Sequence, residues 1–582
     1  MLFVWSSTFA VAGREDILSS SKTPSGSFAG PDNTDARYST FNNVAGNQHI
    51  TYMNYASPSE RILATLKPVE RGGYYVSQCM KGTREDIFTN IDQWLGDFDA
   101  PNVLWLSGSP GAGKSTIASS LVSRLTRRRR LGSSFFFKRG DITLSDPAAL
   151  WRTVAFDLAK SNPTFAHILV RILEQRVVDP RRPDIASHFQ YLIQEPLIKS
   201  HNHFPSHTIP VILVDALDEC DSDRSQAAQR KVLLDTLTQW SCLPRTLKLI
   251  VTGRDDRVPE SFRAICKQIT LPTGGDVSAD ANSDIRHFFE RRFSELGGSS
   301  FPEWPGVQIL DALTTRAAGL FIWAETVMKF VEQGFPGERL KLVLAGELGG
   351  SDNLTKLYRQ ILEVSFHGIR GPELEISRFV IAVIVLAKVP LHYDDLHDFV
   401  SQPKLSVKFV INKLSSVISS RGTDKGLRIC HLSFSEFLCD HERCPEQFFI
   451  DRGKESQSLA LACFRLMKHG LKFNICNLET SHVFNDNVKD LPLRIKTNIP
   501  APLLYSCSFW AAHLRDTTIG RDACGTLMTE VKDFLHIRFL YWLEVMSLTK
   551  QVSAANIALL TAAPWIEVSS YLILVSLSCF VD

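Results

Sequence analysis

The strongest constraint on the fold of this chain is a glycine-rich segment that directly follows a short apolar run. Residues 103–106 (VLWL) have the composition of a buried parallel strand, and residues 108–115 (GSPGAGKS) match G-x-x-x-x-G-K-[S/T] at every position. Glycines let a loop turn its backbone N–H groups inward around phosphates, and a helix that begins near Lys114 adds its positive N-terminal end. The segment therefore predicts a P-loop between a strand and a helix.

The residues of this segment have separate expected roles. The Lys114 ammonium would neutralise the β- and γ-phosphates of a nucleotide, and the Ser115 hydroxyl would bind Mg²⁺. A glycine-rich turn that fits the pattern by chance is the alternative, but the strand before it and the helix after it favour a P-loop. We expect the nucleotide-binding set to be Gly108, Ser109, Pro110, Gly111, Ala112, Gly113, Lys114, Ser115 and Thr116.

A second run, residues 211–215 (VILVD), predicts a central strand that ends in a carboxylate. Parallel sheets bind ligands at the carboxyl ends of their strands, so we expect Asp215 to bind Mg²⁺ together with Ser115, between two neighbouring strand ends. Asp218 and Glu219 would orient a water molecule for attack on the γ-phosphate. An ordinary strand ending in a turn is the alternative, but the position about 100 residues after the P-loop favours the Mg²⁺ strand.

A third strand is predicted at residues 247–251, and it ends close to Arg254. If this strand adjoins the Asp215 strand, Arg254 can contact the γ-phosphate and report its presence. The alternative is a solvent-facing arginine that pairs with Asp255 or Asp256. Residues 268–271 are expected to form the last strand of the sheet.

Length and composition set the remaining limits. A chain of 582 residues is too long for one core, and its net charge of +2 provides no general field to attract nucleic acid or an anionic membrane. Its 12 cysteines show no zinc-ligand spacing, so they indicate reduced thiols and a cytoplasmic protein. We therefore expect neither nucleic acid nor a membrane among its partners.

The pattern of elements predicts an α/β P-loop NTPase, a parallel sheet sandwiched by helices, followed by helical and winged-helix-like parts. After residue 275 the alternation with strands stops and helical spacing dominates. The expected segments are a flexible leader (1–56), a helical lead-in (57–100), the P-loop domain (101–275), a helical domain (276–370), a winged-helix-like domain (371–445) and a helical C-terminal region (446–582).

The segments GSPGAGKS, VILVDALDE, VTGR and CHLSFSEFL, in that order, resemble the NACHT-type signal-transduction NTPases. Within these they are most similar to the fungal proteins in which a NACHT module precedes WD repeats. The likeness covers roughly residues 75–438. It includes GTRED at 82–86, FFFKRGD at 135–141 and AAGLFIWAETVMKF at 317–330.

This resemblance implies a molecular switch that is closed with ADP, opens on exchange for ATP, and then self-associates and engages protein partners. It implies a winged-helix histidine, here His431, that contacts the ADP β-phosphate. It also implies catalytic roles for Asp218, Glu219 and Arg254. The chain departs from the family where Gly319-Leu320-Phe321 lacks the proline that contacts adenine, which leaves ATP and GTP both open.

Two further departures bear on function. Gly253 stands where serine is frequent in the family, and neither an effector domain nor a repeat array is recognisable, so we expect a chain truncated before repeats, a degenerate copy or an adaptor. The leading hypothesis is a signalling switch with slow ATP hydrolysis. A nucleotide-stabilised scaffold without turnover is the alternative, and a metabolic or nucleic-acid ATPase is disfavoured by the near-zero net charge.

Overall fold

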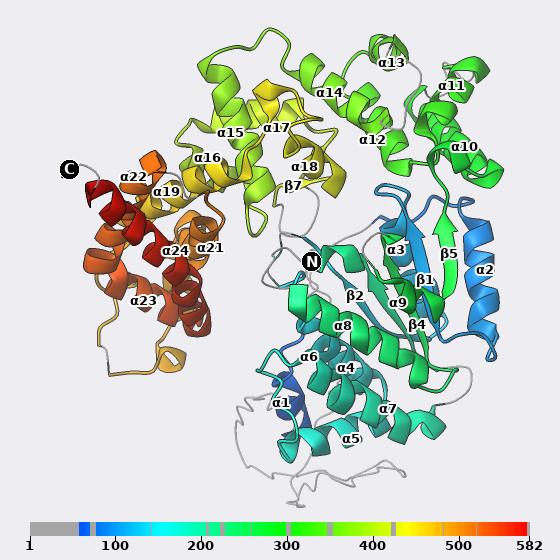
Figure 1. The fold of residues 1–582 in the computed structure, drawn as a ribbon, viewed down its shortest axis with the longest axis horizontal. Coiled ribbons are helices and arrows are strands. Elements are labelled where there is room, and N and C mark those ends of the chain that lie inside the picture. The colour runs from blue at the N-terminus through cyan, green and yellow to red at the C-terminus, as the bar shows by residue number, and fades with distance from the viewer. Residues whose placement is uncertain are drawn as a thin grey trace, which may run out of the picture. The chain divides into compact units, whose positions relative to one another are not determined.

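A five-stranded parallel sheet forms the centre of the N-terminal half. The strands are β1 (Val103–Gly108), β2 (Leu131–Phe136), β3 (Val211–Asp215), β4 (Lys248–Gly253) and β5 (Lys267–Leu271). Their order is β2-β3-β4-β1-β5, and all are parallel (Figure 1). The predicted strands are confirmed. The expectation that the P-loop strand neighbours the Asp215 strand is wrong, because β4 lies between β1 and β3.

The computed structural model describes most of the chain. The described residues are 58–69, 77–139, 141, 143–204, 209–220, 227–255, 258–297, 304–345, 353–420, 426–480, 482–518 and 521–578. The leader predicted for residues 1–56 lies outside this range.

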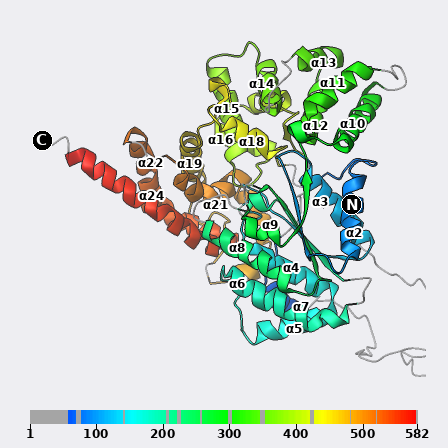
Figure 2. The same cartoon turned by 45° about the vertical axis from the view of Figure 1, so that its right-hand side comes forward.

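Alternate residues of each strand face opposite sides of the sheet, and each side carries its own apolar core. Trp105 packs in the core on one side, whereas Leu104 and Leu106 pack on the other. The first core is covered by α1 (Pro58–Ala64), α4 (Ala149–Ser161), α5 (Pro163–Glu174), α6 (Ile185–Ser187), α7 (Glu195–Ser200), α8 (Ala227–Gln239) and α9 (Glu260–Ala264). The second is covered by α2 (Glu85–Gly96) and α3 (Lys114–Arg127), as Figure 2 shows. The sheet is therefore sandwiched by helices, as predicted.

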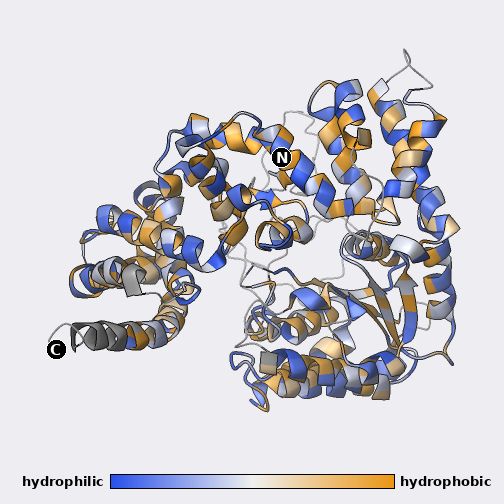
Figure 3. Cartoon of the chain, turned by 45° about the horizontal axis from the view of Figure 1, so that its top comes forward, coloured by the Kyte–Doolittle hydropathy of each residue, from blue (hydrophilic) through white to orange (hydrophobic). Residues whose placement is uncertain are grey.

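Helices dominate after the sheet. The first group comprises α10 (Ala279–Gly297), α11 (Val307–Ala317), α12 (Phe321–Glu332), α13 (Pro336–Ala345) and α14 (Asn353–Ser365). Helical spacing predicts four of these, at residues 284–296, 307–318, 321–333 and 354–366, but not α13. Polar and apolar residues alternate along these helices, as expected for amphipathic helices that bury one side (Figure 3).

A winged-helix-like unit follows this first group. It comprises α15 (Pro372–Leu386), α16 (Tyr393–Val400), α17 (Lys404–Lys413) and the antiparallel pair β6 (Ile418–Ser419) and β7 (Arg428–Ile429). Apolar spacing predicts the third helix of this unit at residues 407–417, but α17 ends at Lys413 and residues 414–417 form turns that lead into β6. The short helix α18 (Leu432–Leu438) begins directly after this pair and carries the end of the CHLSFSEFL segment.

The C-terminal region is helical. It comprises α19 (Arg452–Gly470), α20 (Leu491–Asn498), α21 (Ala501–Arg515), α22 (Arg521–Asp533), α23 (Phe539–Leu548) and α24 (Val552–Ser578). One continuous apolar core runs from Ile285 to Trp565. The domain boundaries predicted at 371 and 446 fall within this core, so they remain predictions. None of the helices in the described ranges has both the length and the apolar character needed to cross a bilayer.

Candidate functional site

The P-loop connects β1 to α3. Gly111 (φ 85°) and Gly113 (φ 99°) both adopt left-handed backbone conformations, which glycine adopts without strain. No side chain in the described ranges caps the start of α3, so its first N–H groups are free to meet an anion. The Lys114 ammonium folds back and donates to the carbonyl oxygens of Gly108 (2.7 Å) and Ser109 (3.1 Å). The loop therefore has the geometry of a phosphate cradle.

Asp215 lies at the end of β3 with only 1% of its surface exposed. Its Oδ1 atom accepts a hydrogen bond from the Thr252 hydroxyl (2.5 Å), which in turn accepts one from the N–H of Ala216 (3.0 Å). Burial raises the pKa of Asp215, and the hydroxyls of Thr252 and Ser115 lower it. The structure thus brings together Ser115 and Asp215, the two residues expected to bind Mg²⁺.

The second oxygen of Asp215 supports a cation site. Oδ2 is buried and has no hydrogen bond of ordinary geometry from any described residue. A buried carboxylate oxygen without a donor is costly unless something else satisfies it. Hard cations prefer carboxylate and hydroxyl oxygens, so the pair of Asp215 and Ser115 fits Mg²⁺.

The acidic turn after β3 meets the arginine that follows β4. Arg254 Nε lies 2.8 Å from Asp218 Oδ2, and these side chains are only 15% and 6% exposed. Glu219 accepts a hydrogen bond from the backbone N–H of Arg139 (3.1 Å), and burial raises the pKa of Glu219 to about 7. Arg254 is therefore not solvent-facing: it pairs with Asp218 and Glu436, whereas Asp255 accepts from the Trp105 indole (2.8 Å). The other partner of that alternative, Asp256, lies outside the described residues.

Gly253, the departure from the family pattern, has a structural explanation. A Cβ atom added to Gly253 would lie 2.5 Å from Cη2 of Trp105, a separation that real Cβ atoms do not show. Trp105 comes from β1, the strand next to β4, and is fully buried. A bulky ring on β1 therefore requires a glycine at the end of β4.

Two segments of the helical half contact the P-loop. The N–H of Ile322, in α12, donates to the carbonyl of Gly111 (3.1 Å), and a Cβ added at Gly111 would lie 2.0 Å from Ile322 Cγ2. The same added atom would lie 3.8 Å from Cε1 of His431. His431 therefore lies close to the loop, and its contact with the β-phosphate of ADP stays a prediction.

His431 also fixes the start of α18. Its Nδ1 atom accepts the backbone N–H of Ser433 (3.1 Å), which leaves the ring proton on Nε2 when the imidazole is neutral. Burial lowers the pKa of His431 to about 4, and the charges of Lys114 and Arg254 add to this shift. The histidine is therefore neutral near pH 7 and can donate through Nε2.

Sequence reasoning assigned no role to Arg84, which is 4% exposed and touches the loop. Its guanidinium donates to the carbonyl of Ala112 (2.9 Å) and lies over the Phe321 ring (4.8 Å). Its backbone N–H donates to Asp284 of α10 (3.0 Å). The GTRED segment was noted for its resemblance, and the left-handed φ of Arg84 (62°) could not be read from it.

Sequence reasoning also assigned no role to Arg139 or Glu436. Arg139 lies just after β2, and Glu436 lies in α18. Both lie within segments that carry the family resemblance, FFFKRGD and CHLSFSEFL, but only the three-dimensional structure shows that they meet beside Asp218.

The sheet order, the loop after β1 and the buried aspartate at the end of β3 define a P-loop NTPase fold. A family model described as "Nephrocystin 3, N-terminal" matches residues 82–254, from the GTRED segment to Arg254. The vegetative incompatibility protein HET-E-1 of Podospora anserina is 23% identical over 493 residues, which is 80% of this chain and 34% of that protein. These matches confirm the predicted resemblance to the NACHT-type signal-transduction NTPases.

Solved structures give looser matches. A signal transduction ATPase with numerous domains (STAND), with a tetratricopeptide repeat sensor, from Pyrococcus horikoshii is 12% identical with a TM-score of 0.38. The match covers 87% of this chain and 66% of that one. Drosophila ORC bound to DNA is 16% identical with a TM-score of 0.29, covering 69% of this chain and 96% of that one. The chain spans about a third of the length of its curated relative.

Proposed function

We propose that this chain is a nucleotide-dependent switch that binds ATP or ADP with Mg²⁺, hydrolyses ATP slowly and self-associates when activated. The observation that carries the proposal is the pair of neighbours at Gly111. Ile322 of the helical part donates its N–H to the Gly111 carbonyl, and the ring of His431 of the winged-helix part lies 3.8 Å from where a Cβ atom at Gly111 would stand. Residues from both parts therefore lie beside one P-loop. A change in what the loop holds therefore acts on both parts at once.

The expected roles follow from the geometry around the loop. Lys114 exchanges its two carbonyl partners for phosphate oxygens, and Ser115 with Asp215 holds the cation. Bound Mg²⁺ would supply charge neutralisation at the phosphates. A carboxylate with a pKa of about 7 is poised to accept a proton near neutral pH, so Glu219 suits the role of general base toward water. Arg254, held by Asp218, would stabilise charge at the γ-phosphate.

The first test removes the ammonium of Lys114. Lys114→Ala loses charge-assisted phosphate contacts worth about 1.5–3 kcal/mol, so ADP and ATP affinity should fall roughly 10- to 150-fold. Titration calorimetry of the full chain with Mg²⁺ measures the affinity. Lys160→Ala, an exposed lysine on α4, is the matched control and should bind as wild type does. Equal affinity in Lys114→Ala and wild type would refute the nucleotide site. Adding GTP as a competitor of ATP in the same titration shows whether the site prefers an adenine or a guanine nucleotide.

A scaffold that binds nucleotide without turnover is the second candidate. The ion pair between Asp218 and Arg254 favours this candidate, because two groups that neutralise each other are less available to orient water or to stabilise the γ-phosphate. Glu219→Gln separates the two functions. If the chain is an ATPase, its turnover should fall about 10²- to 10⁴-fold while ADP affinity stays unchanged. Phosphate release from wild type that never exceeds the background would instead support the scaffold.

A further inference from the structure

Glu436, in α18, joins two arginines that come from different strand ends of the nucleotide sheet. Its Oε1 atom lies 3.1 Å from Nη2 of Arg254, which follows β4. The same oxygen lies 3.3 Å from Nη1 of Arg139, which follows β2. One carboxylate thus bridges the winged-helix part of the chain to two cations of the NTPase part.

The bridge is part of a closed network around the acidic turn. Arg254 uses Nε for Asp218 and Nη2 for Glu436, so its donors are divided between a resident acid and an acid from α18. Arg139 uses Nη2 for the carbonyl of Asp218 (2.9 Å) and Nη1 for Glu436. Glu436 and Arg139 are 25% and 23% exposed, so this network is more shielded than a surface ion pair and more sensitive to the loss of one member.

Arg254 is also the residue expected to contact a γ-phosphate. A guanidinium donates in a fixed fork, and the donors that hold a carboxylate suit a phosphate equally well. We propose that Glu436 is a latch that competes with the terminal phosphate of a nucleoside triphosphate for Arg254 and Arg139. The latch rests on the proposed nucleotide switch. It stays closed over a diphosphate, which has no third phosphate to offer.

The position of α18 explains how release of one carboxylate becomes a larger movement. His431 caps the start of α18 beside Gly111, and Glu436 lies five residues further, so both ends of one short helix rest on the nucleotide site. The Ser433 hydroxyl lies 2.9 Å from the hydroxyl of Tyr358 in α14, which ties the helix to the helical part. A triphosphate that takes both Arg254 and Arg139 would remove the anchor at the Glu436 end of the helix and leave the histidine contact at the other end.

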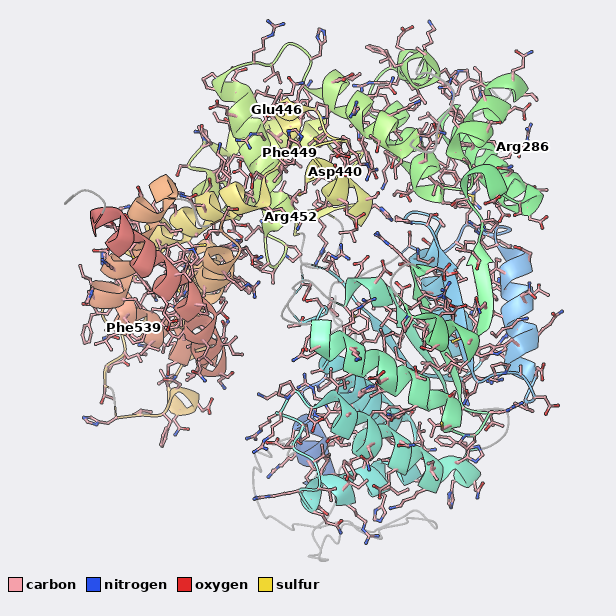
Figure 4. The ribbon with its side chains drawn as sticks, in the orientation of Figure 1. Arg286, Asp440, Glu446, Phe449, Arg452 and Phe539 are labelled. Atoms are coloured by element: carbon pink, nitrogen blue, oxygen red, sulfur yellow. The ribbon has the colours of Figure 1, made fainter. Side chains whose placement is uncertain are left out.

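The test is Glu436→Gln in the full chain, which keeps the size of the side chain and removes its charge. Affinities for ADP and for a non-hydrolysable ATP analogue are measured by calorimetry with Mg²⁺. We expect the affinity for the triphosphate to rise about tenfold relative to wild type, and the affinity for ADP to stay within about twofold. Glu446→Gln removes an exposed carboxylate from the turn after α18 and should leave both affinities unchanged (Figure 4).

Each result bears on the latch. Equal changes for both nucleotides in Glu436→Gln, or no change in either, would overturn it, because packing or remote charge acts without regard to the third phosphate. If wild type binds neither nucleotide, the proposed function itself fails and the latch fails with it. If Glu436→Gln does not fold, Glu436→Asp carries the test. That variant keeps the charge but shortens the reach, and an unchanged ratio of the two affinities would overturn the latch.

Discussion

The two sides of the candidate site contact the rest of the chain in different ways. The loop side, residues 108–113, meets its neighbours mainly through its backbone groups and its shape. Ile322 donates its N–H to Gly111, and Arg84 donates to the carbonyl of Ala112. The acid side, which comprises Asp215, Asp218, Glu219 and Arg254, meets its neighbours through charges and hydroxyls.

This difference determines what can perturb each side. Contacts of backbone and shape depend on the size and conformation of single residues, and protons or salt change them little. Ionic contacts respond to protonation and to a competing anion. The loop side is therefore suited to holding a phosphate chain in one geometry, and the acid side to sensing which chain is present. Three experiments test this division.

The largest effect is expected at Gly111. An alanine there adopts an unfavourable φ and also meets Ile322, whereas an alanine at Gly113 has the unfavourable φ alone, with no described atom within 4 Å. Strain costs about 1–3 kcal/mol and overpacking about 1–3 kcal/mol more, so Gly111→Ala should lose about 2–6 kcal/mol of unfolding free energy and Gly113→Ala about 1–3. Urea unfolding of the nucleotide-free chain measures both.

The matched pair makes this result specific. Both glycines lie in one loop with left-handed φ, so strain is common to them and only the neighbour differs. If the two variants lose the same stability, α12 does not press against the loop. The loop side would then lack the close packing against Ile322 that distinguishes it from the acid side.

A smaller effect is expected at Thr252, which supports the acid side without carrying charge. Thr252→Val keeps the shape and removes the hydroxyl, leaving Asp215 Oδ1 buried without its donor, so stability should fall by about 1–3 kcal/mol. Thr89→Val, in α2, removes an exposed hydroxyl that donates to the carbonyl of Glu85 and should cost at most about 0.5 kcal/mol. Thermal unfolding compares them, and equal losses would show that Thr252 does not support Asp215.

Local patterns predicted the strands and most helices, because apolar runs and helical spacing are written in neighbouring residues. Strand order is not local, and the position of β4 between β1 and β3 depends on how crossover connections pack. Helix α13 was missed because Pro336-Gly337 is typical of a turn, although Pro336 occupies the first helical position in the structure.

The site shows the same limit. The residues of the P-loop were identified because the motif is contiguous, and the pairing of Ser115 with Asp215 followed from a general property of parallel sheets. The contact of Arg84 with Ala112 joins residues 28 apart, and that of Arg254 with Glu436 joins residues 182 apart. Both contacts are made by charged side chains, a type that is common on protein surfaces, so no spacing rule indicates them. The coupling of the site to the helical half therefore required the structure.

The smallest effect is a pH dependence in which His431, beside the loop, and Glu219, on the acid side, oppose each other. Burial lowers the pKa of His431 to about 4 in the folded chain, so between pH 6.5 and pH 4 the imidazole is protonated in the unfolded chain only. The free energy of unfolding therefore decreases as pH falls from 6.5 through 4. Burial raises the pKa of Glu219 to about 7 in the folded chain, so between pH 4.5 and pH 7 the carboxyl is protonated in the folded chain only. The free energy of unfolding therefore decreases as pH rises from 4.5 through 7.

Between pH 4.5 and 6.5 these two slopes have opposite signs and largely cancel in wild type, so only variants reveal them. Relative to wild type, the unfolding free energy of His431→Gln should fall more steeply as pH rises, and that of Glu219→Gln should rise more steeply, each by at most about 1.4 kcal/mol per pH unit. Urea unfolding across this range measures the slopes. If His431→Gln leaves the slope unchanged, the imidazole is not held neutral over the P-loop, and protonation of the winged-helix part could not oppose protonation of the acid side.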